Sequence, residues 1–346
     1  MNTTQTRWLV RCLSLLCLVA GTQDLSAQSK VGTAAAQFLG IPVGPRAIAM
    51  GSAYVAQKSD VTALYWNPGA FQQADRSEVA FAHSDWLVDT DFRWLGFMLR
   101  VGDDNAIGIS LTQLDYGEQA VTSVTQPEGT GENWTAQDLS IALSYSRRLT
   151  DFFSIGGSVK YVNQQIWNES ATAWAFDLGL LFVTGWNGLR LGVTMTNFGG
   201  DLQLEGRDLT ERVDIDPANA GTNKNLVGYL KTDAWPMPLT FRVGLAMDVL
   251  DTETFTATVA ADAIRPNDME ETVNVGAEVG WNRMVFVRGG YKALAAGSRE
   301  DKEYGLTLGA GLHYGLEGIG GIGVDYAYSQ FGAFGNLNTI AVSIDF

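Results

Sequence analysis

The sequence is poor in the residues on which most metal, redox and nucleophilic sites depend. Its 346 residues include two cysteines and two histidines, and 18% are charged. Basic residues number 23 against 38 acidic ones, for a net charge of −15, which disfavours binding to nucleic-acid phosphates. No apolar run approaches the ~18 residues that a membrane-spanning helix needs. With 46% hydrophobic residues, a large soluble domain and a membrane β-barrel remain.

The first 27 residues have the layout of a secretory signal peptide. Two arginines precede an apolar stretch from Cys12 to Ala20, and Leu25-Ser26-Ala27 forms a small-residue cleavage pattern. Cleavage after Ala27 would remove both cysteines. The mature chain would then be exported without thiols, which suits an outer membrane or periplasm.

Apolar residues alternate with polar or small ones from Val79 to Phe346. In one example Phe255, Ala257 and Val259 share a face opposite intervening threonines. About fourteen such segments begin near residues 77, 92, 105, 136, 152, 172, 188, 238, 253, 271, 284, 303, 320 and 337. Most span ~9–13 residues, as tilted strands in a bilayer do. We therefore predict an all-β fold, a transmembrane antiparallel barrel over residues 76–346.

The connections between these segments alternate in length. Short polar turns such as Gly185–Gly188 alternate with long connections at Tyr116–Thr135, Asn163–Thr172 and Gly199–Pro236. Tryptophans fall mostly near strand ends, where lipid meets water, and the last strand ends on Phe346. These features are typical of barrels in the outer membrane of Gram-negative-type cells, surrounded by outer-membrane lipid.

Residues 28–75 lack the alternation and are rich in alanine, glycine and other small apolar residues. A short helix is expected to end before Asn67-Pro68, because a residue that precedes proline avoids the helical region. The segment is too apolar for a flexible tail and too short for a domain. We expect it to fold into the barrel lumen as a plug.

The run Val31–Phe71 combines glycines, one arginine and an aromatic pair at close spacing. Its distinctive positions are Gly44, Arg46, Met50, Gly51, Asp60, Tyr65, Trp66, Asn67 and Pro68. This pattern resembles the N-terminal signature of the PorV/PorQ family, within the FadL-like group of outer-membrane barrels. The resemblance implies fourteen strands, a plug, and a non-enzymatic role in type IX protein secretion, with secreted cargo or secretion machinery as partners. The alternative that it implies is a FadL-like channel for small hydrophobic ligands.

Nothing in the sequence predicts a catalytic, cofactor or metal site. Gly318–Gly323 matches GxGxxG, but a strand pattern follows it, whereas a dinucleotide site needs a helix there. The two histidines, His83 and His313, are too few for a zinc site in a chain without mature cysteines. We therefore expect no enzyme activity and no cofactor.

Charged residues at expected inward positions predict a network that braces lumen and plug, with a polar permeation path as the alternative. They are Lys160, Asp177, Arg190, Arg242, Asp248, Asp262, Glu278, Arg288, Lys292 and Asp325. Arg46 of the expected plug is predicted to pair with these acids.

Two long loops are the expected sites of cargo contact, residues 116–135 and 199–236. The second is acidic, which favours a solvated face. Tyr229 and Trp235 could instead form a protein-docking surface there, since aromatic residues are enriched at contact centres.

Overall fold

A computed structural model describes residues 32–58, 60–186, 188–216, 218–219, 225–294, 305–316 and 320–346. The predicted signal peptide, residues 1–27, lies outside them. Over the described ranges, no helix is both long and apolar enough to cross a membrane.

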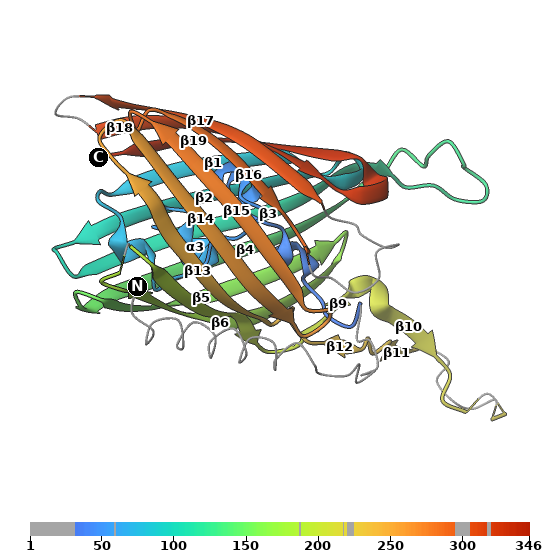
Figure 1. The fold of residues 1–346 in the computed structure, drawn as a ribbon. Coiled ribbons are helices and arrows are strands. Elements are labelled where there is room, and N and C mark those ends of the chain that lie inside the picture. Colours follow the sequence, from blue (N-terminus) through green and yellow to red (C-terminus); the bar gives the residue numbers. More distant parts are fainter. Residues whose placement is uncertain are drawn as a thin grey trace, which may run out of the picture. The chain divides into compact units, whose positions relative to one another are not determined.

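Fourteen antiparallel strands in the described residues form a closed barrel (Figure 1). They are β1 (Glu78–Asp85), β2 (Asp91–Val101), β3 (Asn105–Ala120), β4 (Asn133–Thr150), β5 (Phe153–Ile166), β6 (Glu169–Val183), β7 (Arg190–Gly199), β13 (Thr240–Asp251), β14 (Phe255–Pro266), β15 (Thr272–Trp281), β16 (Val285–Tyr291), β17 (Leu306–Leu316), β18 (Gly320–Gln330) and β19 (Asn336–Asp345). Pairing of β1 with β19 joins the first strand to the last. The predicted barrel is confirmed, and each strand begins within three residues of its expected start.

The alternation in the sequence separates the two faces of the wall. On β14, Phe255 and Val259 are exposed on the outward face, whereas Ala260 and Asp262 are buried on the inward face. A closed sheet satisfies every backbone group between neighbours, which a hydrocarbon environment requires. The outward face therefore carries the apolar residues that lipid would contact.

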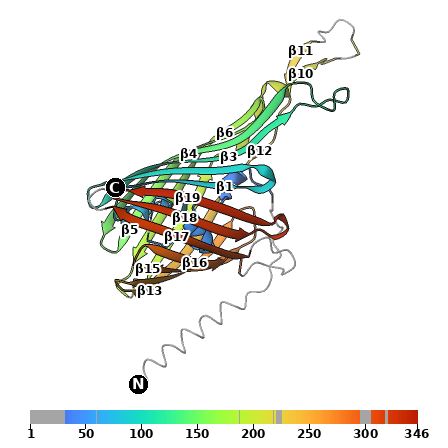
Figure 2. The same ribbon diagram turned by 90° about the horizontal axis from the view of Figure 1, so that it is seen from above.

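Two of the expected long connections are shorter than predicted. The prediction of a long connection at Asn163–Thr172 is wrong, because β5 and β6 continue through it and leave the turn Trp167–Asn168. Likewise β3 and β4 shorten the loop expected at Tyr116–Thr135 to residues 121–132. The apolar alternation stops where strands leave lipid, but backbone pairing continues in water. Figure 2 shows β3, β4 and β6 extending together beyond the ends of β1, β18 and β19.

The acidic connection Gly199–Pro236 also contains short strands. They are β8 (Leu202–Gln203), β9 (Glu205–Gly206), β10 (Thr210–Val213), β11 (Leu226–Tyr229) and β12 (Ala234–Trp235), with the 3-10 turn η4 (Arg207–Leu209). Pairs β8–β12 and β10–β11 form two small sheets, and β9 extends the main sheet beside β6. The β10–β11 hairpin lies outside the ring of barrel strands (Figure 1).

The N-terminal segment lies against the inward face of the wall and supplies much of the core. Its elements are η1 (Gln37–Gly40), α2 (Pro45–Ala49), α3 (Ala63–Trp66) and η2 (Phe71–Gln73); 3-10 turns η3 (Leu87–Asp89) and η6 (Gly332–Phe334) lie in later loops. Leu64 and Phe71 share one buried cluster with Trp94 and Met98 of β2. Helix α3 ends at Trp66, before Asn67-Pro68, as predicted.

We expect Leu245→Arg to destabilise the barrel by about 2–4 kcal/mol, because Leu245 lies outward near the middle of β13 and a charge is costly at the bilayer midplane. The same change at outward Leu250, near the end of β13, should cost about 0–1 kcal/mol. Urea unfolding in phospholipid vesicles measures both. Equal losses would contradict this placement in the bilayer.

Candidate functional site

Glycines on the inward face let the backbone of the N-terminal segment touch the wall. A Cβ at Gly276 would lie 2.2 Å from the Met50 carbonyl oxygen, and one at Gly290 would lie 2.2 Å from the Gly51 nitrogen. Gly51 itself has φ +66°, which favours glycine. The Gly51 N–H donates to Thr307 Oγ1 at 3.0 Å. These contacts leave no room for a side chain at Gly51, Gly276 or Gly290.

A second contact of this kind holds Asn67 and Pro68. The Asn67 side-chain amide donates to the carbonyl oxygens of Val55 at 2.7 Å and Leu180 at 3.0 Å. A Cβ at Gly156 would lie 1.9 Å from the Pro68 carbonyl oxygen. Asn67 therefore joins two parts of the N-terminal segment to strand β6.

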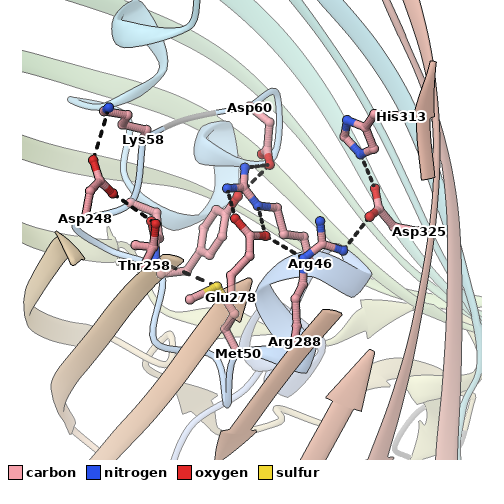
Figure 3. A network of polar contacts seen from close by, with 12 residues as sticks. Arg46, Met50, Lys58, Asp60, Asp248, Thr258, Glu278, Arg288, His313 and Asp325 are labelled. Atoms are coloured by element: carbon pink, nitrogen blue, oxygen red, sulfur yellow. Dashed lines mark hydrogen bonds and ion pairs between the residues drawn. The ribbon is translucent and has the colours of Figure 1, made fainter. Parts of the chain in front are cut away.

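Arg46 on α2 is the charged link between the N-terminal segment and the wall (Figure 3). Its guanidinium donates to both carboxylate oxygens of Glu278, from Nε at 2.9 Å and Nη2 at 2.7 Å. Nη1 donates to Asp60 Oδ2 at 3.2 Å, and the Tyr54 hydroxyl donates to the same oxygen at 2.5 Å. The pairing predicted for Arg46 is thus confirmed.

Arg46 remains charged at this position. Burial on its own would lower the pKa of Arg46, but the carboxylates of Glu278 and Asp60 raise it well above its ordinary value. Burial also raises the pKa of Tyr54, with a contribution from Asp60, so its hydroxyl keeps the proton that it donates. The cluster holds a fixed positive charge between two carboxylates.

The network continues along the inward face of the wall beyond Glu278. Arg288 donates to Glu278 and to Asp325, each at 2.5 Å, and Asp325 contacts His313 Nε2 at 3.1 Å. The guanidinium of Arg288 is almost fully buried. Residues Arg46, Glu278, Arg288, Asp325 and His313 therefore form one continuous polar chain across β15–β18.

A second network centres on Asp248. Arg190 donates to both of its oxygens, at 2.7 and 3.0 Å, and Lys58 lies 3.1 Å away. Arg190 also donates from Nε to the Ala56 carbonyl oxygen at 3.0 Å. Wall and N-terminal segment are again linked by charge.

Other inward charges have local partners. Lys160 lies 2.6 Å from Asp177. The Asp262 carboxylate accepts hydrogen bonds from the backbone N–H groups of Tyr54 and Val55. The Arg242 guanidinium lies 5.6 Å from the centre of the Trp66 ring. These contacts favour bracing over an open polar path, because paired charges inside a wall stabilise one arrangement.

The remaining motif residues shape the N-terminal segment itself. Trp66 Nε1 donates to the Val43 carbonyl oxygen at 2.8 Å, and the Tyr65 hydroxyl donates to that of Leu39 at 3.1 Å. At Gly44, φ is +82° and a Cβ would lie 2.8 Å from Thr62 Cγ2. The structure thus brings the motif residues into one connected cluster inside the barrel.

Tyr229 and Trp235 lie apart from this cluster and on separate small sheets. Tyr229 on β11 is 77% exposed, and Trp235 on β12 is 46% exposed. Tyr229 lines a hollow of about 610 Å³ together with Leu204, Leu209 and Leu230. Trp235 is not among its lining residues.

The two histidines lie on different strands. His313 belongs to the luminal network, whereas His83 on β1 faces outward beside Asp85 and Asp91. This acidic group was not foreseen, since its members meet across two strands. Arg93 donates to Asp91 at 2.7 Å, so the group is an exposed ion-pair cluster. Of the GxGxxG run, Gly318 and Ile319 lie outside the described residues, and the rest opens strand β18, as predicted.

Comparisons with known proteins agree with this geometry. The family model described as Type IX secretion system protein PorV matches residues 24–180, which confirms the resemblance indicated by Val31–Phe71. No curated protein matches.

Solved structures of similar fold include three outer-membrane barrels. The CymD monoaromatic hydrocarbon channel has a TM-score of 0.55 and 14% identity, with 88% of this chain and 97% of that one covered. The Pseudomonas putida toluene transporter TodX has a TM-score of 0.52 and 14% identity, and the match covers 88% of this chain and 97% of that one. A Pseudomonas aeruginosa FadL homologue has a TM-score of 0.51 and 12% identity, and the match covers 88% of this chain and 98% of that one. At these identities the likeness establishes the fold, a FadL-like barrel.

We predict that Gly290→Ala destabilises the protein by about 1–3 kcal/mol, as overpacking does, because the new Cβ would collide with Gly51. Gly289→Ala is the matched control: it adds the same methyl group on the outward face, where the nearest atom is 3.7 Å away. It should change stability by no more than about 0.5 kcal/mol. Equal thermal stability of both variants in detergent would refute the close contact.

Arg46→Ala should lower the free energy of unfolding by about 1.5–3 kcal/mol, the range for hydrogen bonds to charged groups. Glu278 keeps Arg288 as a partner, which limits the loss. Arg93→Ala removes an exposed ion pair with Asp91 and should cost about 0–1 kcal/mol. Urea titrations followed by tryptophan fluorescence compare the two; a smaller effect at Arg46 than at Arg93 would rule out the bracing role.

Proposed function

We propose, from the resemblance to the PorV family over residues 24–180, that this barrel is a non-enzymatic component of type IX protein secretion. In this proposal it sits in the outer membrane of a Gram-negative-type cell and binds or shuttles secreted cargo through its loops. The family and the fold are those of outer-membrane transport and secretion components. The observation that carries the proposal is the hairpin β10–β11, which lies outside the barrel and exposes apolar side chains.

The side chains of this hairpin suit a contact surface. Val227 and Tyr229 are 66% and 77% exposed, and Val213 is 44% exposed. A two-stranded sheet is marginally stable on its own in water, so packing against a partner would stabilise it. Aromatic residues are enriched in protein interfaces, which supports a role for Tyr229 and, on the neighbouring sheet, Trp235.

We further propose three functional segments: a cleaved signal peptide over residues 1–27, a plug over 28–75, and the barrel over 76–346. Support for the plug comes from the contacts of Arg46, Gly51 and Asn67 with the inward wall. In this arrangement the N-terminal segment is held in place by charge and by close backbone contact. Cargo would therefore be handled at the loops, with the lumen serving as support.

The alternative is a channel for small hydrophobic molecules. It is supported by the fold shared with the CymD hydrocarbon channel and the TodX toluene transporter. Such a channel needs a route past the N-terminal segment, which the networks around Arg46 and Asp248 oppose. Uptake of radiolabelled toluene by cells that express the protein, compared with cells that lack it, tests this alternative.

We expect Tyr229→Ala and Trp235→Ala together to reduce the cargo that co-purifies with the protein by tenfold or more, about 1.4 kcal/mol or more in binding. Pull-down from gently solubilised outer membranes, followed by mass spectrometry of secreted proteins, measures this. Trp186→Ala is the control, because the exposure of Trp186 lies between those of Tyr229 and Trp235 but the residue lies in a short turn between β6 and β7. Undiminished cargo in the double variant would overturn the assignment of this loop.

A further inference from the structure

A hollow interrupts the outward face of the wall where β13, β14 and β15 meet. Its volume is about 420 Å³. Ala263 lies at its centre, directly paired with Val243 on β13 and Val273 on β15. The small side chain of Ala263 between two larger ones makes the depression, and Phe241 forms a further wall. Arg265 and Glu271 lie at its rim.

The position of Arg265 on β14 places it at the edge of the apolar band. The outward residues of β14 begin at Phe255 and end at Arg265. Phe255, at the end of the strand away from Arg265, pairs with Trp281 of β15. The ten residue steps from Phe255 to Arg265 span roughly 25 Å along the barrel axis, at ~3.3 Å per residue and a tilt of ~40°. That height equals the apolar band of outer-membrane barrels. The guanidinium therefore lies where acyl chains end and headgroups begin.

Arg265 is available to a ligand from the membrane. Its side chain is 75% exposed, and its partner Glu271, at 3.2 Å, is 66% exposed. Exposed ion pairs contribute little free energy, so a phosphate group can replace Glu271 as the partner of Arg265. The fork of a guanidinium matches the oxygens of a phosphate group.

We propose that this hollow binds one anionic phospholipid, with an acyl chain over Ala263 and the phosphate on Arg265. The hollow faces the hydrocarbon of the bilayer, so acyl chains are the material that fills it. Arg265 attracts the net negative charge of an anionic headgroup and Glu271 opposes it, so the expected preference over a zwitterionic lipid is modest. The site lies on the outside of the barrel and is independent of the loops and of the function proposed for them.

The probe is a pair of lipids with identical acyl chains, phosphatidylglycerol and phosphatidylcholine, added in equal amounts to the purified, delipidated protein. Native mass spectrometry counts the bound lipid. We expect phosphatidylglycerol to be favoured roughly three- to fivefold, in the upper part of the range of an exposed ion pair. Arg265→Gln should remove this preference, and Glu271→Gln should increase it, because Glu271 competes with the phosphate.

Ala263→Phe fills the hollow and should reduce bound phosphatidylglycerol to the level of non-specific adducts. Ala310→Phe is the matched control, since Ala310 also faces outward, on β17, and does not line the hollow. Heat-dependent gel migration verifies that each variant is folded. Equal binding of both lipids, or a preference that survives Ala263→Phe, would overturn the proposal. A protein dimer lost in Ala263→Phe would overturn it too, and would identify the hollow as a protein interface.

Discussion

The need to pair every backbone N–H and C=O without help from water governs this molecule. Closure between β1 and β19 meets that need in the wall. Closure also creates an interior, and the polar side chains that alternate inward need hydrogen-bond and charge partners there. The N-terminal segment does much of this: its backbone meets inward glycines, and its Arg46 meets inward carboxylates. Fold and interior are thus two results of one constraint.

Charge inside the wall follows a consistent arrangement. Each network joins the N-terminal segment to strands distant in sequence, through Arg46 to Glu278 and through Lys58 to Asp248. Removing one member of a buried pair leaves the other desolvated, so the networks favour a single placement of the segment. Apolar groups of similar volume could fill the same space with comparable stability, but they would not require these particular partners.

Sequence patterns predicted the barrel because alternation has a simple physical cause: one face contacts lipid and the other does not. The same reasoning overlooked the extensions of β5 and β6 through Asn163–Thr172, where both faces lie in water and alternation ends before pairing does. It predicted that Arg46 would pair with acids, since a buried charge requires a partner. It could not select Glu278, because the choice depends on the register of β15 against α2.

The inward glycines also constrain the order of assembly. Gly51 occurs early in the chain, yet it contacts Val275, Tyr291 and Thr307, which are synthesised more than two hundred residues later. Such distant contacts carry a high entropic cost before they form. The N-terminal segment can therefore reach its final position only after the last third of the wall exists. Until then its apolar side chains lack the wall that buries them in the finished barrel.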